Sequence, residues 1–189
     1  MGNPEFSIII PTLNEEKLLE GLFANLKEAI RHTKHSVEVI VADGGSTDGT
    51  ITIALRYADK IVNAKFDEVN NIASGRNAGA KNAAGDFLVF CNADILFDDV
   101  KYVIDSIYTE FETKSRLIAI AAWVDTFPEE EKTIDRIFHR FYNHYFKFLN
   151  TLNLGMGRGE CIIVKKEFFE KAGYFNFALP AGEDFELFH

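Results

Sequence analysis

The sequence of 189 residues contains few cysteines, few prolines and no long apolar run. Two cysteines cannot build the disulfide framework of a small secreted domain, so we expect Cys91 and Cys161, each beside an apolar run, to be buried free thiols. Four prolines mark no linker, and the length fits a single domain spanning residues 1–189. No apolar run reaches the roughly 18 residues of a membrane span, and no basic segment followed by an apolar one opens the chain, so we expect a cytoplasmic protein.

Positive charge is also in short supply, because 20 Lys and Arg stand against 29 Asp and Glu and give a formal net charge of -9. Nucleic-acid binding relies on basic patches that displace counterions from phosphates, so this balance argues against nucleic acid as the main partner. It leaves open a small anionic ligand in a local pocket. The chain stops within an acidic and aromatic pattern at 183–189 with no stop signal, and we expect the native protein to continue.

Short apolar runs alternate with helical patterns along the chain. The expected strands are the apolar runs at 6–11, 37–42, 61–62, 86–91 and 117–124, with another beginning at Cys161. Apolar residues at helical spacing predict helices at 15–31, 50–58, 70–84 and 100–111, the first of them with Asn14 as its N-cap. This alternation is typical of an α/β fold with a mostly parallel central sheet covered by helices on both faces.

Polar residues follow three of the expected strands. They are Thr12, Asn14 and Glu15 after the first strand, Asp43 after the second, and Asn92 and Asp94 after the run that ends at Cys91. Any one of them alone is more often a turn or a helix cap than a site. Ligands of parallel sheets, however, bind at the carboxyl ends of the strands, so three polar strand ends at one edge indicate a binding site.

The signatures of several nucleotide-binding folds are missing. The first strand is followed by PTLNEE, which is neither the Gly-x-Gly-x-x-Gly of a dinucleotide-binding fold nor the Asp-x-Asp-x-Thr of a haloacid-type phosphatase, and no Walker A loop occurs. What remains is an acidic pocket of nucleotide size, with carboxylates that suit Mg²⁺ or Mn²⁺ because these cations prefer oxygen ligands.

Five segments carry a resemblance to a known family. They are IIIPTLNEE at 8–16, VADGGSTDGT at 41–50, GRNAGAKNAAGD at 75–86, NAD at 92–94 and ED at 183–184. In this order they resemble the family 2 glycosyltransferases. The resemblance implies a GT-A fold, a Rossmann-like sandwich, and transfer of a sugar from a UDP- or GDP-linked donor to an acceptor hydroxyl. It places nucleotide-sugar binding in about residues 1–98 and the acceptor side in about 99–189.

The resemblance also assigns roles to the donor-side residues. It implies that Thr12, Asn14 and Glu15 line the nucleotide pocket, that Asp43 contacts the base or ribose, that Arg76 lies near the nucleotide and its phosphates, and that Asp94 holds the Mg²⁺ or Mn²⁺ that bridges the diphosphate. The sequence departs from the family's Asp-x-Asp at Asn92, which replaces the first aspartate. An amide there is a weaker metal ligand, but it can still hydrogen-bond a ribose hydroxyl.

Two acidic residues near the end of the chain are the catalytic candidates. The resemblance implies that Asp184 is the base of an inverting direct displacement, which removes the proton of the acceptor hydroxyl as it attacks. Glu183 either positions the acceptor or is itself the base; without the other motifs, both would read as acids at a helix N-terminus. The alternative function is a catalytically silent module that binds sugar nucleotides or docks on a membrane.

The segment 131–150 has helical periodicity and is basic within an acidic protein. One interpretation is a core-packing helix with a solvated basic face. The other is a helix that contacts an anionic membrane surface, at the inner face of the membrane, and meets a lipid-linked acceptor; a polysaccharide acceptor is the alternative. Eleven of the 18 phenylalanines lie in the last 63 residues, which we assign to the acceptor half, with core packing as the competing explanation.

Overall fold

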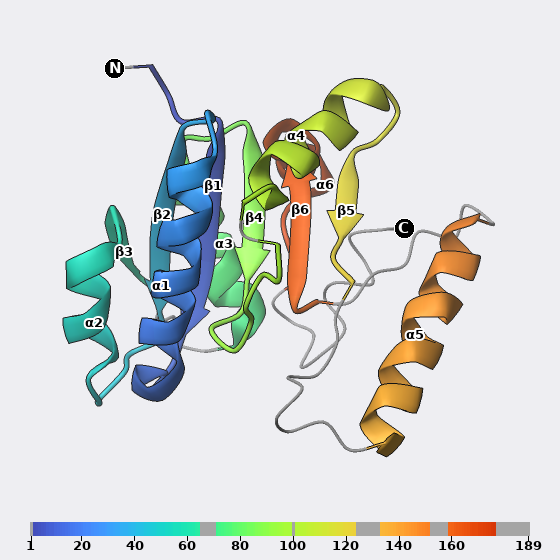
Figure 1. The fold of residues 1–189 in the computed structure, drawn as a ribbon. Helices are drawn as coiled ribbons and strands as arrows, with labels where there is room; N and C mark the ends of the chain where they lie inside the picture. The colour runs from blue at the N-terminus through green and yellow to red at the C-terminus, as the bar shows by residue number, and fades with distance from the viewer. Residues whose placement is uncertain (1, 65–70, 100, 124–132, 152–158, 177–189) are drawn as a thin grey trace.

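The computed structural model describes residues 2–64, 71–99, 101–123, 133–151 and 159–176, and Figure 1 shows their arrangement. The described strands are β1 (Phe6–Thr12), β2 (Val37–Asp43), β3 (Lys60–Asn63), β4 (Phe87–Cys91), β5 (Ala119–Ala121) and β6 (Cys161–Lys165). The described helices are α1 (Glu16–His32), α2 (Thr50–Tyr57), α3 (Ile72–Asn82), α4 (Val103–Thr113), α5 (Thr133–Thr151) and α6 (Lys166–Ala172). The expected alternation of strands and helices is confirmed, although β5 is shorter than its apolar run and α6 follows β6 without a loop.

The strands form one sheet in the order β3-β2-β1-β4-β6-β5. The four strands β3, β2, β1 and β4 are parallel, whereas β6 runs antiparallel to β4 and β5 antiparallel to β6. The expectation of a mostly parallel sheet is therefore confirmed. The carboxyl ends of β1, β2 and β4 consequently lie at the same edge, which is where the polar strand ends of the sequence fall.

Helices cover both faces of the sheet, as expected. On one face, alternate residues of β1 such as Ile8 and Ile10 pack with apolar residues of α1, α2 and α4. On the other face, Ile9 packs with α3 and with Phe169 of α6. Figure 1 shows α1 and α4 in front of the sheet, with α3 and α6 behind it. Because successive side chains of a strand point to opposite faces, the apolar runs at 8–10 in β1 and 87–91 in β4 are typical of strands that are buried on both sides.

The two cysteines lie opposite each other on the antiparallel strands β4 and β6, and both are buried free thiols, which confirms the expectation. The hydrogen bond with Cys161, together with burial, raises the pKa of Cys91 well above its usual value. The Cys91 thiol is therefore protonated at neutral pH, and both cysteines act as small core residues. Phe169 and Phe175 pack around Phe90 in the same core, so core packing explains at least these two residues of the phenylalanine-rich end.

None of the helices in the described ranges is both long enough and apolar enough to cross a membrane.

Helix α3 lies unusually close to β1 because Gly79 has no side chain. A Cβ at Gly79 would stand 2.3 Å from Cγ2 of Ile9, which is fully buried in the sheet and has no room to move. The small residues of the 75–86 segment thus bring the helix, and Arg76 with it, against the strands that carry the polar ends.

We expect Gly79→Ala to lower the free energy of unfolding by up to about 2 kcal/mol. Overpacking of a core costs about 1–3 kcal/mol, which outweighs the gain of roughly 1 kcal/mol in helix propensity. The control is Gly21→Ala in α1, where a Cβ meets nothing within 4 Å and the same exchange should stabilise the protein. Urea unfolding of both variants measures the difference, and a stabilised Gly79→Ala protein would contradict the close approach.

Candidate functional site

The first two strands end side by side in Thr12 and Asp43, both almost fully buried. The hydroxyl of Thr12 donates to Oδ1 of Asp43 at 3.2 Å. The other oxygen of Asp43 accepts the backbone N–H groups of Gly45 and Ser46, each at 2.9 Å. The carboxylate therefore fixes the sharp turn after β2, in which Gly45 takes a φ of 100°.

The loop after β1 is tied to the loop after β2 through Asn14. Its side-chain oxygen accepts the backbone N–H of Thr47 at 2.8 Å, and its own N–H donates to the hydroxyl of Ser46 at 2.9 Å. Asn14 holds a φ of 59° in the left-handed region, which asparagine tolerates better than most residues. The two loops consequently form one rigid rim at this edge of the sheet.

The expectation that Asn14 caps α1 is wrong. The N-cap position is Glu15, and it makes no side-chain cap of its own. Instead, Thr50 and Asp48 from the loop after β2 accept the first backbone N–H groups of the helix, those of Glu15 at 2.8 Å and Glu16 at 3.2 Å. The cap is supplied by residues more than thirty positions away, so a local pattern could not predict it.

Glu15 is the candidate whose ionisation the fold changes most clearly. Partial burial raises its pKa, and the negative charges of Asp94 and Asp48 raise it further. The structure therefore brings the carboxylates after β1 and β4 within electrostatic reach of each other. Asp94 is exposed at the end of β4, whereas Glu15 is half-buried.

This raised pKa makes a testable contribution to stability. Between the pKa of Glu15 in the unfolded chain and its higher pKa in the folded protein, the folded state binds more protons, so stability falls as pH rises through that window. We expect Glu15→Gln to raise the unfolding temperature of the metal-free protein at neutral pH, and to raise it no longer below about pH 4. Thermal unfolding at both pH values checks this. Glu112→Gln, at an exposed residue of α4, is the control that should change little at either pH.

Arg76 lies almost fully buried beneath the end of β4. Its guanidinium donates to Oδ1 of Asn92 at 3.0 Å and to the carbonyl of Gly159, and it stands 5.5 Å from the centre of the Phe175 ring. The arginine thus joins α3, the end of β4 and the residues before β6. Asn92 is half-buried, and its amide oxygen is oriented by this contact.

Asn77, which no sequence pattern singled out, ties this arrangement to Phe175. Its side chain, directly after Arg76 in α3, exchanges two hydrogen bonds with the backbone of Phe175, at 2.8 and 3.0 Å. Both Asn77 and Arg76 lie in the 75–86 segment, but only the fold shows that Phe175 is their common neighbour.

A cavity of about 180 Å³ opens where β1, β2 and α3 meet. It is lined by Pro11, Thr12, Leu13, Glu15, Ala42, Gly44, Asn71, Ile72 and Gly75. Two of the candidate residues, Thr12 and Glu15, are among them, whereas Asn14, Asp43, Arg76, Asn92 and Asp94 are not. Because Glu15 also lies within the electrostatic reach of Asp94, it connects this cavity to the end of β4.

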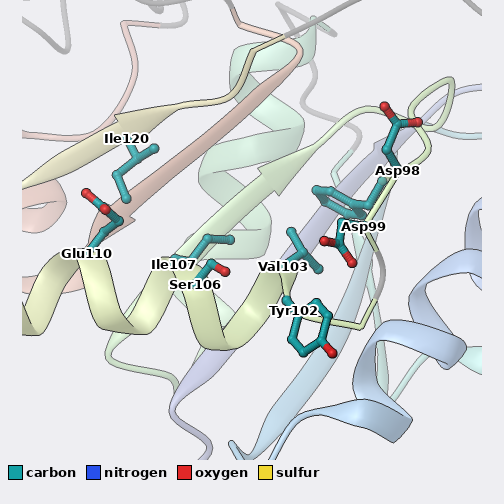
Figure 2. A pocket seen from close by; sticks show the side chains of 9 residues that line it. Asp98, Asp99, Tyr102, Val103, Ser106, Ile107, Glu110 and Ile120 are labelled. Atoms are coloured by element: carbon teal, nitrogen blue, oxygen red, sulfur yellow. The ribbon is translucent and has the colours of Figure 1, made fainter.

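A larger cavity of about 330 Å³ lies elsewhere, between α4 and β5. Figure 2 shows Asp98 and Asp99 at one end of it and Glu110 with Ile120 at the other, around the apolar side chains of α4. None of the candidate residues lines this cavity. Its size therefore does not make it the site, and the polar strand ends remain the better candidate.

Two further predictions concern the catalytic acids and the metal. Glu183 and Asp184 lie outside the described residues, so their roles stay predictions. Within the described ranges, no three His, Cys, Asp or Glu side chains gather into a group that could hold a metal ion. The candidate side chains that lie at or just beyond the carboxyl ends of β1, β2 and β4 are Thr12, Asn14, Glu15, Asp43, Asn92 and Asp94.

Known proteins resemble this chain in sequence. The sequence model of the family described as Glycosyl transferase family 2 matches residues 7–173. The poly(ribitol-phosphate) beta-N-acetylglucosaminyltransferase TarS of Staphylococcus aureus is 35% identical over 94 residues, which are 48% of this chain and 16% of that protein. A PGL/p-HBAD biosynthesis glycosyltransferase of Mycobacterium bovis is 35% identical over 122 residues, 63% of this chain and 42% of the relative. The chain spans less than half the length of both relatives.

Solved structures resemble it in fold. The mannosyltransferase PcManGT from Pyrobaculum calidifontis, in complex with GDP-Man and Mn²⁺, has a TM-score of 0.70 at 23% identity, over 98% of this chain and 51% of that one. TarS 1–349 of S. aureus, in complex with UDP-GlcNAc, has a TM-score of 0.73 at 20% identity, over 97% of this chain and 52% of that one. At these identities the likeness shows the fold alone. Since the family model covers residues 7–173, the chain belongs to glycosyl transferase family 2, and it has the GT-A fold.

Proposed function

We propose that this protein transfers a sugar from a nucleotide-diphosphate sugar, UDP- or GDP-linked, to an acceptor hydroxyl. One observation carries the proposal: Glu15 lines the cavity at the ends of β1 and β2 and also feels the charge of Asp94 at the end of β4. The cavity is smaller than the roughly 300–1,000 Å³ that encloses a whole ligand, so it would take the nucleoside end of the donor. The diphosphate would then lie toward Asp94.

Family membership supports this assignment, and so do the ligands of structurally similar proteins. TarS has been solved with UDP-GlcNAc and PcManGT with GDP-Man, each in a fold that matches nearly all of this chain. In the proposed complex, Thr12 and Asn14 shape the nucleoside pocket. Asp43 would contact the base or ribose. It also fixes the turn after β2 by accepting the N–H of Ser46, and Ser46 in turn accepts the N–H of Asn14 from the loop after β1.

The residues at the end of β4 fit a divalent cation. Asp94 is exposed there, and its mutual repulsion with Glu15 is the kind of unbalanced negative charge that a cation relieves. Carboxylate and diphosphate oxygens are ligands that Mg²⁺ and Mn²⁺ prefer, so Asp94 would hold the ion together with the donor. A bound ion would supply positive charge against the departing nucleoside diphosphate.

Asn92 has a different role in this proposal. Because its oxygen accepts from Arg76, its NH₂ group is left to donate, and we assign it to a ribose hydroxyl or a diphosphate oxygen of the donor. Arg76 then acts from beneath the site. Its positive charge lies below the end of β4, where it also favours an anionic ligand.

The transfer itself is proposed as a direct displacement with inversion. Asp184 accepts the proton of the acceptor hydroxyl as that oxygen attacks the anomeric carbon, and the bond to the diphosphate breaks on the opposite side. Glu183 positions the acceptor. The acceptor half, about residues 99–189, would receive a lipid-linked molecule or a polysaccharide.

A donor panel tests this function. The protein is incubated with UDP- and GDP-sugars, with Mn²⁺ or Mg²⁺ or with a chelator, and the release of nucleoside diphosphate is measured. We expect release with at least one donor, and only in the presence of metal. Calorimetric binding of a donor without any release, across a range of acceptors, would instead identify a silent sugar-nucleotide-binding module.

A further inference from the structure

Helix α5 carries an apolar stripe that faces away from the protein. Its members are Ile134, Ile137, Phe138, Phe141, Tyr145 and Phe148, and each is between 44% and 72% exposed. Their spacing of three or four residues places them along one side of the helix. Figure 1 shows α5 beside the sheet, beyond the edge strand β5 and apart from it.

The opposite side of α5 faces the rest of the protein. Asn143, which lies roughly 180° around the helix from the centre of the stripe, is only 6% exposed. His144, on the flank of the helix, contacts the ring of Trp123 in the segment after β5, with 5.3 Å between the ring centres. The helix therefore buries a polar residue and exposes its aromatic ones, which is the reverse of a helix that packs on a core.

The charges beside the stripe are positive. Arg140 and Lys147 are exposed, roughly 110–130° around the helix from the centre of the stripe. Between Ile134 and Phe148 these two residues and Arg136 outnumber the single acidic residue, Asp135. The whole protein has a formal net charge of -9, so this helix is a local exception. An apolar aromatic stripe flanked by Lys and Arg matches an anionic lipid surface, where the rings enter the headgroup region and the cations meet the lipid charges.

We propose that α5 binds an anionic bilayer surface through this stripe, so that the protein is a peripheral membrane protein. A second copy of the chain fits less well, because pairing two such faces would bring Arg140 and Lys147 close to their own counterparts. The proposal goes beyond sugar transfer and does not depend on it, since no donor or acceptor enters the argument.

Vesicle flotation of the full chain, without donor or metal, tests the proposal. We expect binding to vesicles of phosphatidylcholine with phosphatidylglycerol, weaker binding at high salt, and little binding to pure phosphatidylcholine. Arg140→Glu combined with Lys147→Glu should weaken the partition coefficient by at least about 25-fold, at roughly fivefold per basic residue. Phe141→Glu should abolish binding.

Matched controls test whether vesicle binding depends on this stripe or only on net charge and exposed apolar residues in general. Lys17→Glu with Lys27→Glu makes the same change of charge on exposed residues of α1, and Leu55→Glu places an acid at a 71% exposed residue of α2. Both controls should bind vesicles nearly as the parent does. Circular dichroism verifies that all the variants are folded.

Two outcomes would overturn the proposal. One is negligible binding to both kinds of vesicle. The other is a dimer in sedimentation velocity that Phe141→Glu dissociates, with no vesicle binding, which would make the stripe a contact between copies. Neither outcome bears on nucleoside diphosphate release in the donor panel, so the two proposals fail separately.

Discussion

Asp94→Ala should lower kcat/KM for the proposed transfer by at least about 100-fold, with most of the loss in metal-dependent donor binding. Asp94 is the exposed carboxylate at the end of β4, and stabilisation of transition-state charge by a metal ion is worth several kcal/mol, at roughly tenfold for each 1.4 kcal/mol. Calorimetry with a nucleoside diphosphate should show Mn²⁺ strengthening binding to the parent protein and not to the variant. Because the side chain is exposed, the variant should fold normally.

The control for this substitution is Asp98→Ala, four residues along the same segment. Asp98 is also exposed, but it lines the cavity beside α4 and does not lie with the polar residues at the ends of β1, β2 and β4. It should leave both the kinetics and the metal effect unchanged. Equal losses in the two variants would mean that general negative charge near β4, and not a ligand at Asp94, supports binding.

Much of the fold could be predicted because its signals are local. The strands β1, β2 and β4 are buried on both faces, so each contains a continuous apolar run: 8–10 in β1, 39–42 in β2 and 87–91 in β4. The leucines of α1 recur at helical spacing because that helix buries only one side against the sheet. The polar strand ends could be grouped in advance because parallel strands end at one edge, and in the structure Thr12 and Asp43 are hydrogen-bonded there.

The features that escaped prediction depend on residues far apart in the sequence. The cap of α1 comes from Asp48 and Thr50, and no pattern near Asn14 contains that information. An apolar run does not show the direction in which its strand will pair. The sequence therefore could not predict that β6 runs antiparallel to β4. The periodicity of α5 could be read from the sequence, but it does not say which side of the helix faces outward.

Arg76 illustrates the same limit at the candidate site. A basic residue in a segment that resembles a donor-binding family is naturally placed beside the phosphates. The structure buries its guanidinium under Asn92, Gly159 and Phe175, three residues from three separate parts of the chain. We therefore propose that Arg76 acts on a ligand through its charge and through the orientation of the Asn92 amide, as a positioning residue and not as one that contacts the donor.

The identity of the base is decided by a pair of isosteric substitutions at the neighbouring acids. We expect Asp184→Asn to lower kcat by about 10²–10⁴-fold, the usual contribution of a general base, while the donor Kd stays within a few fold. Glu183→Gln should instead raise the KM for the acceptor more than it lowers kcat, because a positioning group acts mainly on binding.

The pH dependence of kcat shows which of the two acids is the base, whatever the size of the loss of activity in either variant. With a carboxylate base, kcat falls at acidic pH as the base becomes protonated, and that limb should vanish in whichever variant lacks the base. An acidic limb that persists in Asp184→Asn and disappears in Glu183→Gln would move the base to Glu183. Persistence of the limb in both variants would place the base outside this pair and remove the main argument for their catalytic role.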